Sequence, residues 1–197
     1  MISSQLIRAS IVGMVCLASV SVVQAHGDAK AHTHKHHHAD EAHVHGVGEL
    51  EVVQDGPRVS ISLYSPLHNV LGFERAPRTE AEKSRVKASN AQLKSKGLYD
   101  FTPAAQCQQT DVRIRSEVLN PHGHGPGADH QHAGGSEHSD VKVIWEFECA
   151  KPEAVKEIDV RLFKVFPGFE TLQTQALFAK GQVGAKLTSK QSKLVAP

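Results

Sequence analysis

Sulfur-containing residues are scarce in this sequence. Among 197 residues there are two methionines and three cysteines, and both methionines and Cys16 lie within the first 25 positions. Removal of that segment would leave Cys107 and Cys149 as the only sulfur ligands, and a disulfide between them would leave none. Because Cu(I) prefers thiolate and thioether ligands, the composition argues against a Cu(I) protein. A zinc site made of cysteine alone is disfavoured as well, since it needs more than two thiolates.

The sequence also lacks an excess of one charge and a long apolar run. Lysine and arginine number 22, and aspartate and glutamate number 21. Nucleic acid is therefore not expected as the main partner, because phosphate binding requires clustered basic residues. With 40% hydrophobic and 5% aromatic residues, the composition suits a modest soluble core. The motifs H-E-x-x-H and G-x-S-x-G and a phosphate-binding loop are missing, so no enzymatic activity is expected.

Residues 1–25 have the features of a cleavable secretory signal peptide. Arg8 precedes an apolar stretch over residues 11–23, which is too short to span a membrane. Residues 23–25 place small side chains at the two positions that matter for cleavage, so cleavage is expected before His26. No membrane insertion is expected after cleavage.

Composition divides the remaining chain into a tail and one domain. Residues 26–45 form a His-rich tail that is predicted to be disordered. Residues 46–197 are predicted to form a single β-rich domain that contains a flexible His-rich loop at residues 120–140. The predicted fold class is α+β, a mainly antiparallel β-sheet with one covering helix.

The first strands are predicted to form a hairpin with a defined register. Apolar and polar residues alternate on both sides of Asp55-Gly56, which is a strong signal for a two-residue turn. A turn at that position pairs Leu50 with Ile61 and Val52 with Val59. The predicted register therefore places apolar residues opposite apolar residues.

One helix is predicted over residues 79–96. Thr79 and Glu82 have the spacing of a capping box, and Gly97 is expected at the first position beyond the helix. The apolar face of this segment is thin. The helix is therefore expected to cover one side of a sheet.

The strands on either side of the second His-rich stretch are predicted to pair as a hairpin. A disulfide between Cys107 and Cys149, which an oxidising compartment favours over two buried free thiols, would tie its base. Direct pairing of the two cysteines puts the apolar residues of the two strands out of phase, so a β-bulge is predicted within residues 108–111. Three further strands are predicted to complete the sheet, over residues 158–166, 171–178 and 183–187.

Thirteen of the fourteen histidines fall into two stretches, residues 26–45 and 122–138. Neutral imidazole suits Zn(II), Ni(II) and Cu(II), and zinc takes about four nitrogen, oxygen or sulfur ligands. A glycine-containing loop can fold several imidazoles and a carboxylate around one ion, although ordering it costs entropy. The alternative is that such tracts are solvated low-complexity segments. The predicted metal ligands are His32, His34, His36, His37, His38, His43, His45, His122, His124, His130, His132, His138, Asp129 and Asp140.

Two histidines are separate cases. His68 lies outside both stretches, close to Pro66 and Asn69. A lone histidine in a structured loop is more often a hydrogen-bonding residue than a ligand. His26 would become the N-terminal residue, where its amine and ring could chelate Cu(II) together. An accident of cleavage is the alternative explanation for His26.

Several short motifs are spread along the chain beyond the signal peptide. They are His43-Val44-His45-Gly46, Ser65-Pro66, Asn69-Val70-Leu71-Gly72-Phe73-Glu74, Ala105-Gln106-Cys107, Trp145-Glu146-Phe147-Glu148-Cys149, Leu162-Phe163 and Phe166-Pro167. Together they resemble the ZrgA-like family of periplasmic, zinc-regulated, His-rich proteins of Gram-negative bacteria. In that family a histidine often follows Gly-Phe-Glu, whereas this chain has Arg75, so no ligand is expected there.

The resemblance implies zinc binding in the periplasm and a link to zinc acquisition. Together with the histidines, it predicts a protein that captures or buffers Zn(II) through its His/Asp-rich loops and assists zinc uptake. Metal would then pass to an uptake system, with the solute-binding protein of a zinc ABC importer as the candidate partner. Two alternatives stay open: a periplasmic nickel- or copper-binding resistance protein, and a structural or interaction module whose histidine tracts are incidental.

Overall fold

The computed structural model describes residues 44–120 and 139–197, and β-strands account for most of their regular structure. The predicted signal peptide, most of the predicted tail and nearly all of the predicted loop lie outside these residues. The strands are β1 (Val47–Asp55), β2 (Arg58–Pro66), β3 (Tyr99–Phe101), β4 (Cys107–Arg115), β5 (Asp140–Cys149), β6 (Glu157–Val160), β7 (Thr171–Phe178), β8 (Gly181–Leu187) and β9 (Lys193–Val195). The helices are α1 (His68–Leu71), α2 (Glu80–Lys94) and α3 (Leu162–Val165), with 3₁₀ turns η1 (Pro103–Ala105) and η2 (Pro152–Ala154).

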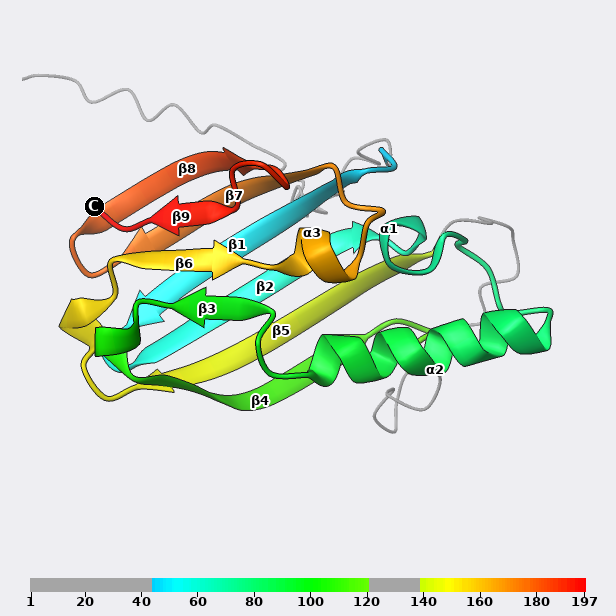
Figure 1. Ribbon diagram of the computed structural model, residues 1–197, viewed down its shortest axis with the longest axis horizontal. Helices are drawn as coiled ribbons and strands as arrows, with labels where there is room; N and C mark the ends of the chain where they lie inside the picture. Colours follow the sequence, from blue (N-terminus) through cyan, green and yellow to red (C-terminus); the bar gives the residue numbers. More distant parts are fainter. Residues whose placement is uncertain (1–43, 121–138) are drawn as a thin grey trace, which may run out of the picture. The chain divides into compact units, whose positions relative to one another are not determined.

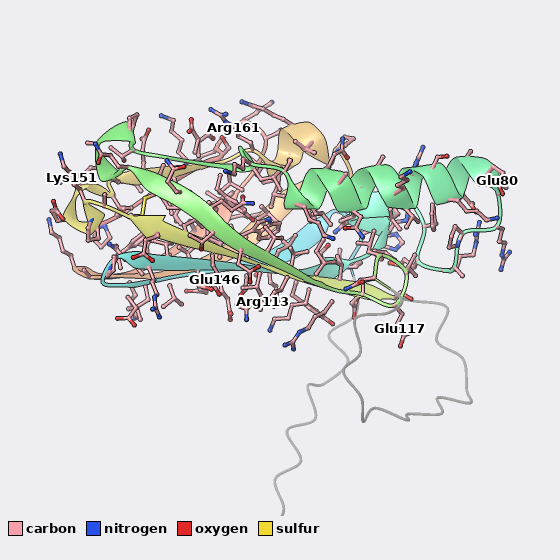
Figure 2. All side chains as sticks on the ribbon, turned by 90° about the horizontal axis from the view of Figure 1, so that it is seen from below. Glu80, Arg113, Glu117, Glu146, Lys151 and Arg161 are labelled. Carbon is pink, nitrogen blue, oxygen red and sulfur yellow. A yellow bond between two sulfur atoms is a disulfide. The ribbon has the colours of Figure 1, made fainter. Side chains whose placement is uncertain are left out.

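The described strands form two sheets. The larger sheet has six strands in the order β4-β5-β2-β1-β7-β8, and the smaller has three in the order β3-β6-β9. The smaller sheet and α2 lie on the same face of the larger sheet (Figure 1). Figure 2 shows Arg113 and Glu146 on the opposite face, where their side chains form an ion pair.

The described strands pair mainly antiparallel, as predicted, but the structure differs from one antiparallel sheet in two respects. β1 and β7 pair in parallel, so the larger sheet is mixed. Residues 158–166 are not one strand of that sheet, because β6 ends at Val160 and belongs to the smaller sheet. Leu162, Phe163 and Phe166 are all buried, and positions with this spacing share a face on a helix but not on a strand. The chain accordingly turns through α3 before β7 begins.

The first hairpin forms as predicted, but its register differs. Leu50 pairs with Leu63 and Val52 with Ile61, because the two-residue loop is Gly56-Pro57 rather than Asp55-Gly56. Proline has no N–H to donate to a strand ladder, so it is better placed in the turn. Gly56 has φ +56°, which glycine adopts without the steric cost of a side chain. The observed partner of each β1 residue is two positions away from the predicted partner on β2. Since side chains alternate between faces with a period of two, the predicted apolar face is retained.

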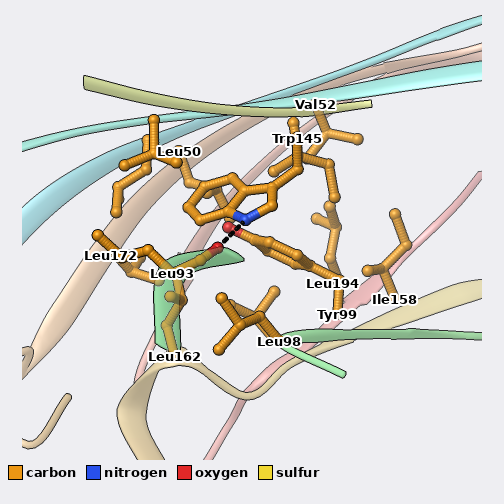
Figure 3. Packing of buried hydrophobic residues seen from close by; sticks show 14 of the residues in the cluster. Leu50, Val52, Leu93, Leu98, Tyr99, Trp145, Ile158, Leu162, Leu172 and Leu194 are labelled. Atoms are coloured by element: carbon orange, nitrogen blue, oxygen red, sulfur yellow. Dashed lines mark hydrogen bonds between the residues drawn. The ribbon is translucent and has the colours of Figure 1, made fainter. Parts of the chain in front are cut away.

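The core lies between the two sheets, with Trp145 near its centre (Figure 3). The Trp145 side chain is fully buried, and its indole N–H donates a hydrogen bond to the Leu93 carbonyl oxygen at 2.7 Å. Leu93 is also fully buried, so the last turn of α2 is held against β5 by packing and by this bond. Tyr99 of β3 packs edge-on against the indole, with ring centroids 5.0 Å apart.

Helix α2 begins as predicted and ends slightly earlier. The Thr79 hydroxyl accepts from the Glu82 N–H, and the Glu82 carboxylate accepts from the Thr79 N–H, which completes the capping box. The last helical residue is Lys94, and Ser95 is the C-cap with extended dihedral angles. Gly97 is therefore the second residue after the C-cap and not the first, as the prediction had it.

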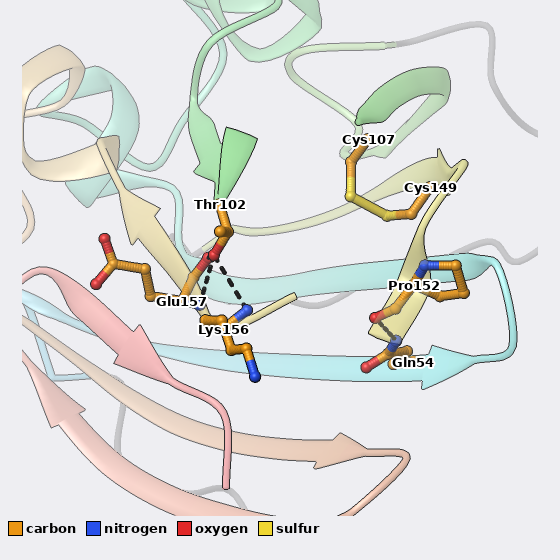
Figure 4. The surroundings of a disulfide bond; sticks show 7 residues. All are labelled: Gln54, Thr102, Cys107, Cys149, Pro152, Lys156 and Glu157. Carbon is orange, nitrogen blue, oxygen red and sulfur yellow. Dashed lines mark hydrogen bonds between the residues drawn. A yellow bond between two sulfur atoms is a disulfide. The ribbon is translucent and has the colours of Figure 1, made fainter. Parts of the chain in front are cut away.

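The second hairpin confirms the predicted disulfide and the predicted bulge. Cys107 and Cys149 are direct partners in the β4–β5 ladder and are joined by a disulfide (Figure 4). The register shifts between Gln109 and Asp111, so Val112 pairs with Trp145; Trp145 is in the core and Val112 packs against it. One extra residue is what brings the apolar residues of the two strands back into phase.

Candidate metal centre

Both His-rich stretches of the sequence join the described chain at the same end of the large sheet. β2 is antiparallel to both β1 and β5, so β1 and β5 begin where β2 ends. Helix α1 directly follows β2 at this end (Figure 1). The Leu67 N–H, next to α1, donates to the Ser139 carbonyl oxygen at 2.8 Å. The residues that enter β1 and β5 therefore both lie close to α1.

Two histidines and a carboxylate meet at this end. The rings of His45 and His68 are stacked, with centroids 3.9 Å apart and planes inclined by 8°. His45 Nε2 lies 3.1 Å from Glu74 Oε1. The His45 side chain is 51% exposed, whereas the Glu74 side chain is 7% exposed. The cluster thus has a buried carboxylate at its base and an imidazole open to solvent.

The local sequence explains how Glu74 reaches His45. Helix α1 ends after one turn at Gly72, which has φ +78° and donates its N–H to the His68 carbonyl oxygen. Glycine adopts this left-handed conformation at little cost, and it commonly ends helices in this way. The chain turns there and brings Glu74 beside His45, two residues before β1 begins. Arg85 of α2 holds the turn by donating to the Leu71 carbonyl oxygen at 3.1 Å.

Imidazole nitrogen and carboxylate oxygen are common ligands of Zn(II). In their present orientation, the rings of His45 and His68 cannot bind one metal ion together. The lone pair of an imidazole nitrogen lies in the ring plane, and two nearly parallel planes do not converge on one ion. No group of three or more histidine, cysteine or acidic residues within residues 44–120 and 139–197 is arranged to hold a metal ion. Rotation of one ring about its side-chain bonds would be required to bring both nitrogens toward a common point.

Of the predicted ligands, His45 and Asp140 lie in the described part of the chain. Asp140 begins β5 and accepts a hydrogen bond from the Tyr64 hydroxyl at 2.6 Å. Burial and the Asp140 carboxylate raise the pKa of Tyr64 above its usual value. The other predicted ligands lie outside the described residues: His32, His34, His36, His37, His38, His43, His122, His124, His130, His132, His138 and Asp129.

Sequence reasoning missed one member of the cluster and gave another less weight. Glu74 appeared in the sequence analysis only as part of a motif. His68 was expected to be a hydrogen-bonding residue, because a lone histidine in a structured loop is more often that than a metal ligand. The sequence signal for Glu74 was the motif over Asn69–Glu74. A short helix that ends in glycine reverses the chain direction, which brings the residues after the glycine back toward the start of the helix. The neighbouring Arg75 has a different role, because it forms an ion pair with Glu82 and lies over the Phe73 ring.

The described fold is a disulfide-linked, mixed β-sheet domain with two imidazoles and a carboxylate gathered at one end. This chain belongs to the ZrgA family of zinc uptake proteins, since the family described as ZrgA family zinc uptake protein matches residues 42–196. No curated protein matches the sequence. The matched residues include His45, His68, Glu74 and both cysteines of the disulfide.

Family membership associates the protein with zinc and with zinc uptake. Together with the Cys107–Cys149 disulfide, it indicates an extracytoplasmic protein. Within residues 44–120 and 139–197, no helix has the length and apolar character needed to cross a membrane.

Proposed function

We propose that this protein is a periplasmic, non-enzymatic zinc-binding protein that captures Zn(II) and assists its uptake. The observation that carries the proposal is the cluster of His45, His68 and Glu74 at the end of the large sheet. In this proposal Zn(II) is cargo. The two imidazoles and the Glu74 carboxylate supply three of the about four ligands that zinc takes, and water or a further side chain supplies the rest.

Glu74 supplies a carboxylate oxygen at the base of the cluster. Its side chain is 7% exposed, so this oxygen is largely shielded from solvent. The imidazole of His45 already lies beside it at 3.1 Å and is half-exposed. Zinc could therefore enter from the solvent side, after a rotation of the His45 ring that does not require the backbone to move.

The histidines of residues 26–43 and 122–138 serve in this proposal as weaker, exchangeable sites that collect and buffer zinc. Support comes from their points of attachment, because the chain enters β1 at Val47 and β5 at Asp140, both at the end where α1 lies. A site releases metal readily when ordering its ligands offsets part of the binding energy. Zinc would then pass to the solute-binding protein of a zinc ABC importer.

The test is a zinc titration of the purified chain against a competing chelator. His45→Ala together with His68→Ala should weaken the tightest site by about a hundredfold or more, since loss of ligands exceeds the ten- to hundredfold effect of outer-sphere changes. The matched control is His130→Ala with His132→Ala, which removes the same number of imidazoles from the second His-rich stretch. This control should lower the number of weak sites and leave the tightest one in place.

Three results would contradict the proposal. If deletion of residues 121–139 removed the tightest site, capture would belong to that stretch instead of the cluster of His45, His68 and Glu74. If bound zinc did not change between about pH 7.5 and about pH 5, imidazoles would not be the ligands, since they must be neutral to bind metal. If growth in scarce zinc did not depend on the cluster or on either His-rich stretch, the protein would be a structural or interaction module. Competition among Zn(II), Ni(II) and Cu(II) tests the nickel or copper alternative. Tighter binding of Cu(II) would not by itself favour that alternative, because nitrogen and oxygen sites generally bind Cu(II) more tightly than Zn(II).

A further inference from the structure

Asn69 connects the two histidine positions of the cluster formed by His45, His68 and Glu74. It follows His68 on α1 and is 2% exposed. Its Oδ1 accepts from the Gly46 N–H at 2.7 Å, and its Nδ2 donates to the Val47 carbonyl oxygen at 2.8 Å and to the Ser65 hydroxyl oxygen at 3.0 Å. One buried amide thus contacts the backbone of the two residues that follow His45.

The orientation of this amide is determined by its partners. A backbone N–H can only donate and a backbone carbonyl can only accept, so the oxygen must face Gly46 and the nitrogen must face Val47. Both hydrogens of the Asn69 amide nitrogen are used, one on Val47 and one on Ser65. No other residue type of the same size offers an acceptor and two donors in this arrangement.

The backbone beside His45 is held from the other side as well. The Gly46 carbonyl oxygen accepts from the N–H groups of Glu170 and Thr171, at 2.8 and 2.9 Å. Gly46 is therefore fixed at its nitrogen by Asn69 and at its oxygen by the chain that enters β7. Since the backbone is fixed, the His45 ring can move mainly by rotation about its own side-chain bonds.

We propose that Asn69 is a positioning residue of the zinc site, which holds the backbone after His45 so that its ring lies over His68. The proposal rests on the proposed function, because it assigns Asn69 to the same site. Asn69 does not contact the metal in this proposal. It limits the separation of the two imidazoles, so that little ordering is left for zinc to impose.

The test compares Asn69→Asp and Asn69→Ala with the unsubstituted chain. Aspartate keeps an acceptor for the Gly46 N–H but cannot donate to Val47, and alanine keeps neither contact. Both variants should weaken the tightest zinc site by about tenfold to about a hundredfold, the range of outer-sphere substitutions. The matched control is Gln54→Ala, which removes an amide hydrogen bond to the Pro152 carbonyl oxygen at the far end of β1. This control should leave zinc affinity unchanged.

Two further measurements distinguish positioning from a purely structural role. In a His45→Ala background, Asn69→Asp should cause no additional loss of affinity, because the ring it positions is absent. In the metal-free chain, stacking shifts the ring protons of His45 and His68, and this shift should disappear in the NMR spectrum of Asn69→Asp. If neither Asn69 variant folds, Ser65→Ala removes one of the three amide contacts and should give a smaller loss of affinity in a folded chain.

The outcomes separate the two proposals. If His45→Ala with His68→Ala weakens zinc binding but the Asn69 variants bind as tightly as Gln54→Ala, the positioning role is wrong and the zinc site stands. If the double histidine variant binds zinc normally, the proposed function is wrong, and the positioning role in zinc binding falls with it. An unchanged histidine NMR shift in Asn69→Asp, or unchanged affinity in a folded Ser65→Ala chain, would also overturn the positioning role.

Discussion

Removal of the disulfide is predicted to cause a large loss of stability with little effect on the zinc site. The change is Cys107→Ala together with Cys149→Ala. The two cysteines are 42 residues apart in the sequence and join the start of β4 to the end of β5. The proposed zinc cluster lies near the other end of β5, where Asp140 pairs with Pro66 directly before α1.

The expected magnitude follows from the length of the closed loop. A cross-link over 42 residues removes chain entropy from the unfolded state worth about 4 kcal/mol at 25 °C. For a chain of this size that corresponds to a fall in melting temperature of roughly 8–16 °C. Deletion of residues 121–138 would shorten the loop to little more than half, yet the disulfide contribution would change by only about 0.5 kcal/mol, because the entropy depends on the logarithm of loop length.

The assay is urea unfolding followed by circular dichroism, with and without a thiol reductant. Reduction should lower the stability of the unsubstituted chain to that of the double variant and should not affect the double variant itself. Zinc affinity, measured below the unfolding transition, should be the same in both chains. Equal stability of the two chains would refute the reasoning, and a weakened zinc site in the folded double variant would refute the separation of the two ends of β5.

Three other predictions follow from the described residues. The pKa of Glu82 is lowered to about 2, chiefly by its hydrogen bonds from Arg75. This carboxylate should therefore stabilise the fold above its usual pKa of 4.5 and lose that contribution as the pH falls toward 2. An NMR titration of Glu82 should give a midpoint near 2, and a midpoint near 4.5 would contradict this. Trp145→Phe leaves a buried carbonyl without its donor and should cost about 1–3 kcal/mol in urea unfolding, and no measurable change would show that the bond is unimportant. Gly168→Ala would bring a Cβ into a clash with the Asn69 carbonyl oxygen, and it should destabilise the fold by about 1–3 kcal/mol and weaken zinc binding. Gly184→Ala, whose Cβ would have its nearest atom at 3.5 Å, should do neither. Equal melting temperatures for the two variants would be inconsistent with this packing.

Features that depend on neighbouring residues could be predicted from the sequence. The capping box of α2 needs only Thr79 and Glu82 at the right spacing, so the start of the helix was predicted correctly. The bulge in β4 follows from the two-residue period of strands, since Cys107 and Val112 cannot share a face without one extra residue. The register of the first hairpin was wrong because the turn signal of Asp55-Gly56 was given more weight than the missing N–H of Pro57.

Histidine counting predicted metal chemistry but not the site that the described residues form. Composition records how many imidazoles a segment carries, whereas a site depends on which of them the backbone brings together. His45 is the last histidine of the predicted tail, His68 was an isolated one, and Glu74 was not considered as a ligand. Their proximity becomes visible only once β1, β2 and α1 are placed beside one another.

The sequence by itself determined the first hairpin, the start of α2, the disulfide and the apolar faces of most predicted strands, because each depends on local spacing or on simple pairing. Tertiary structure alone decided the parallel pairing of β1 with β7, the separate sheet that contains β6, and the meeting of His45, His68 and Glu74. These features join residues that are far apart in the chain. Their geometry is set by burial and by long-range hydrogen bonds such as those of Asn69, which reaches 22 and 23 residues back along the chain. Local sequence patterns do not specify which distant residue forms the hydrogen bond to a given buried polar group. That pairing is set only in the folded chain, where nearly all buried polar groups are hydrogen-bonded together.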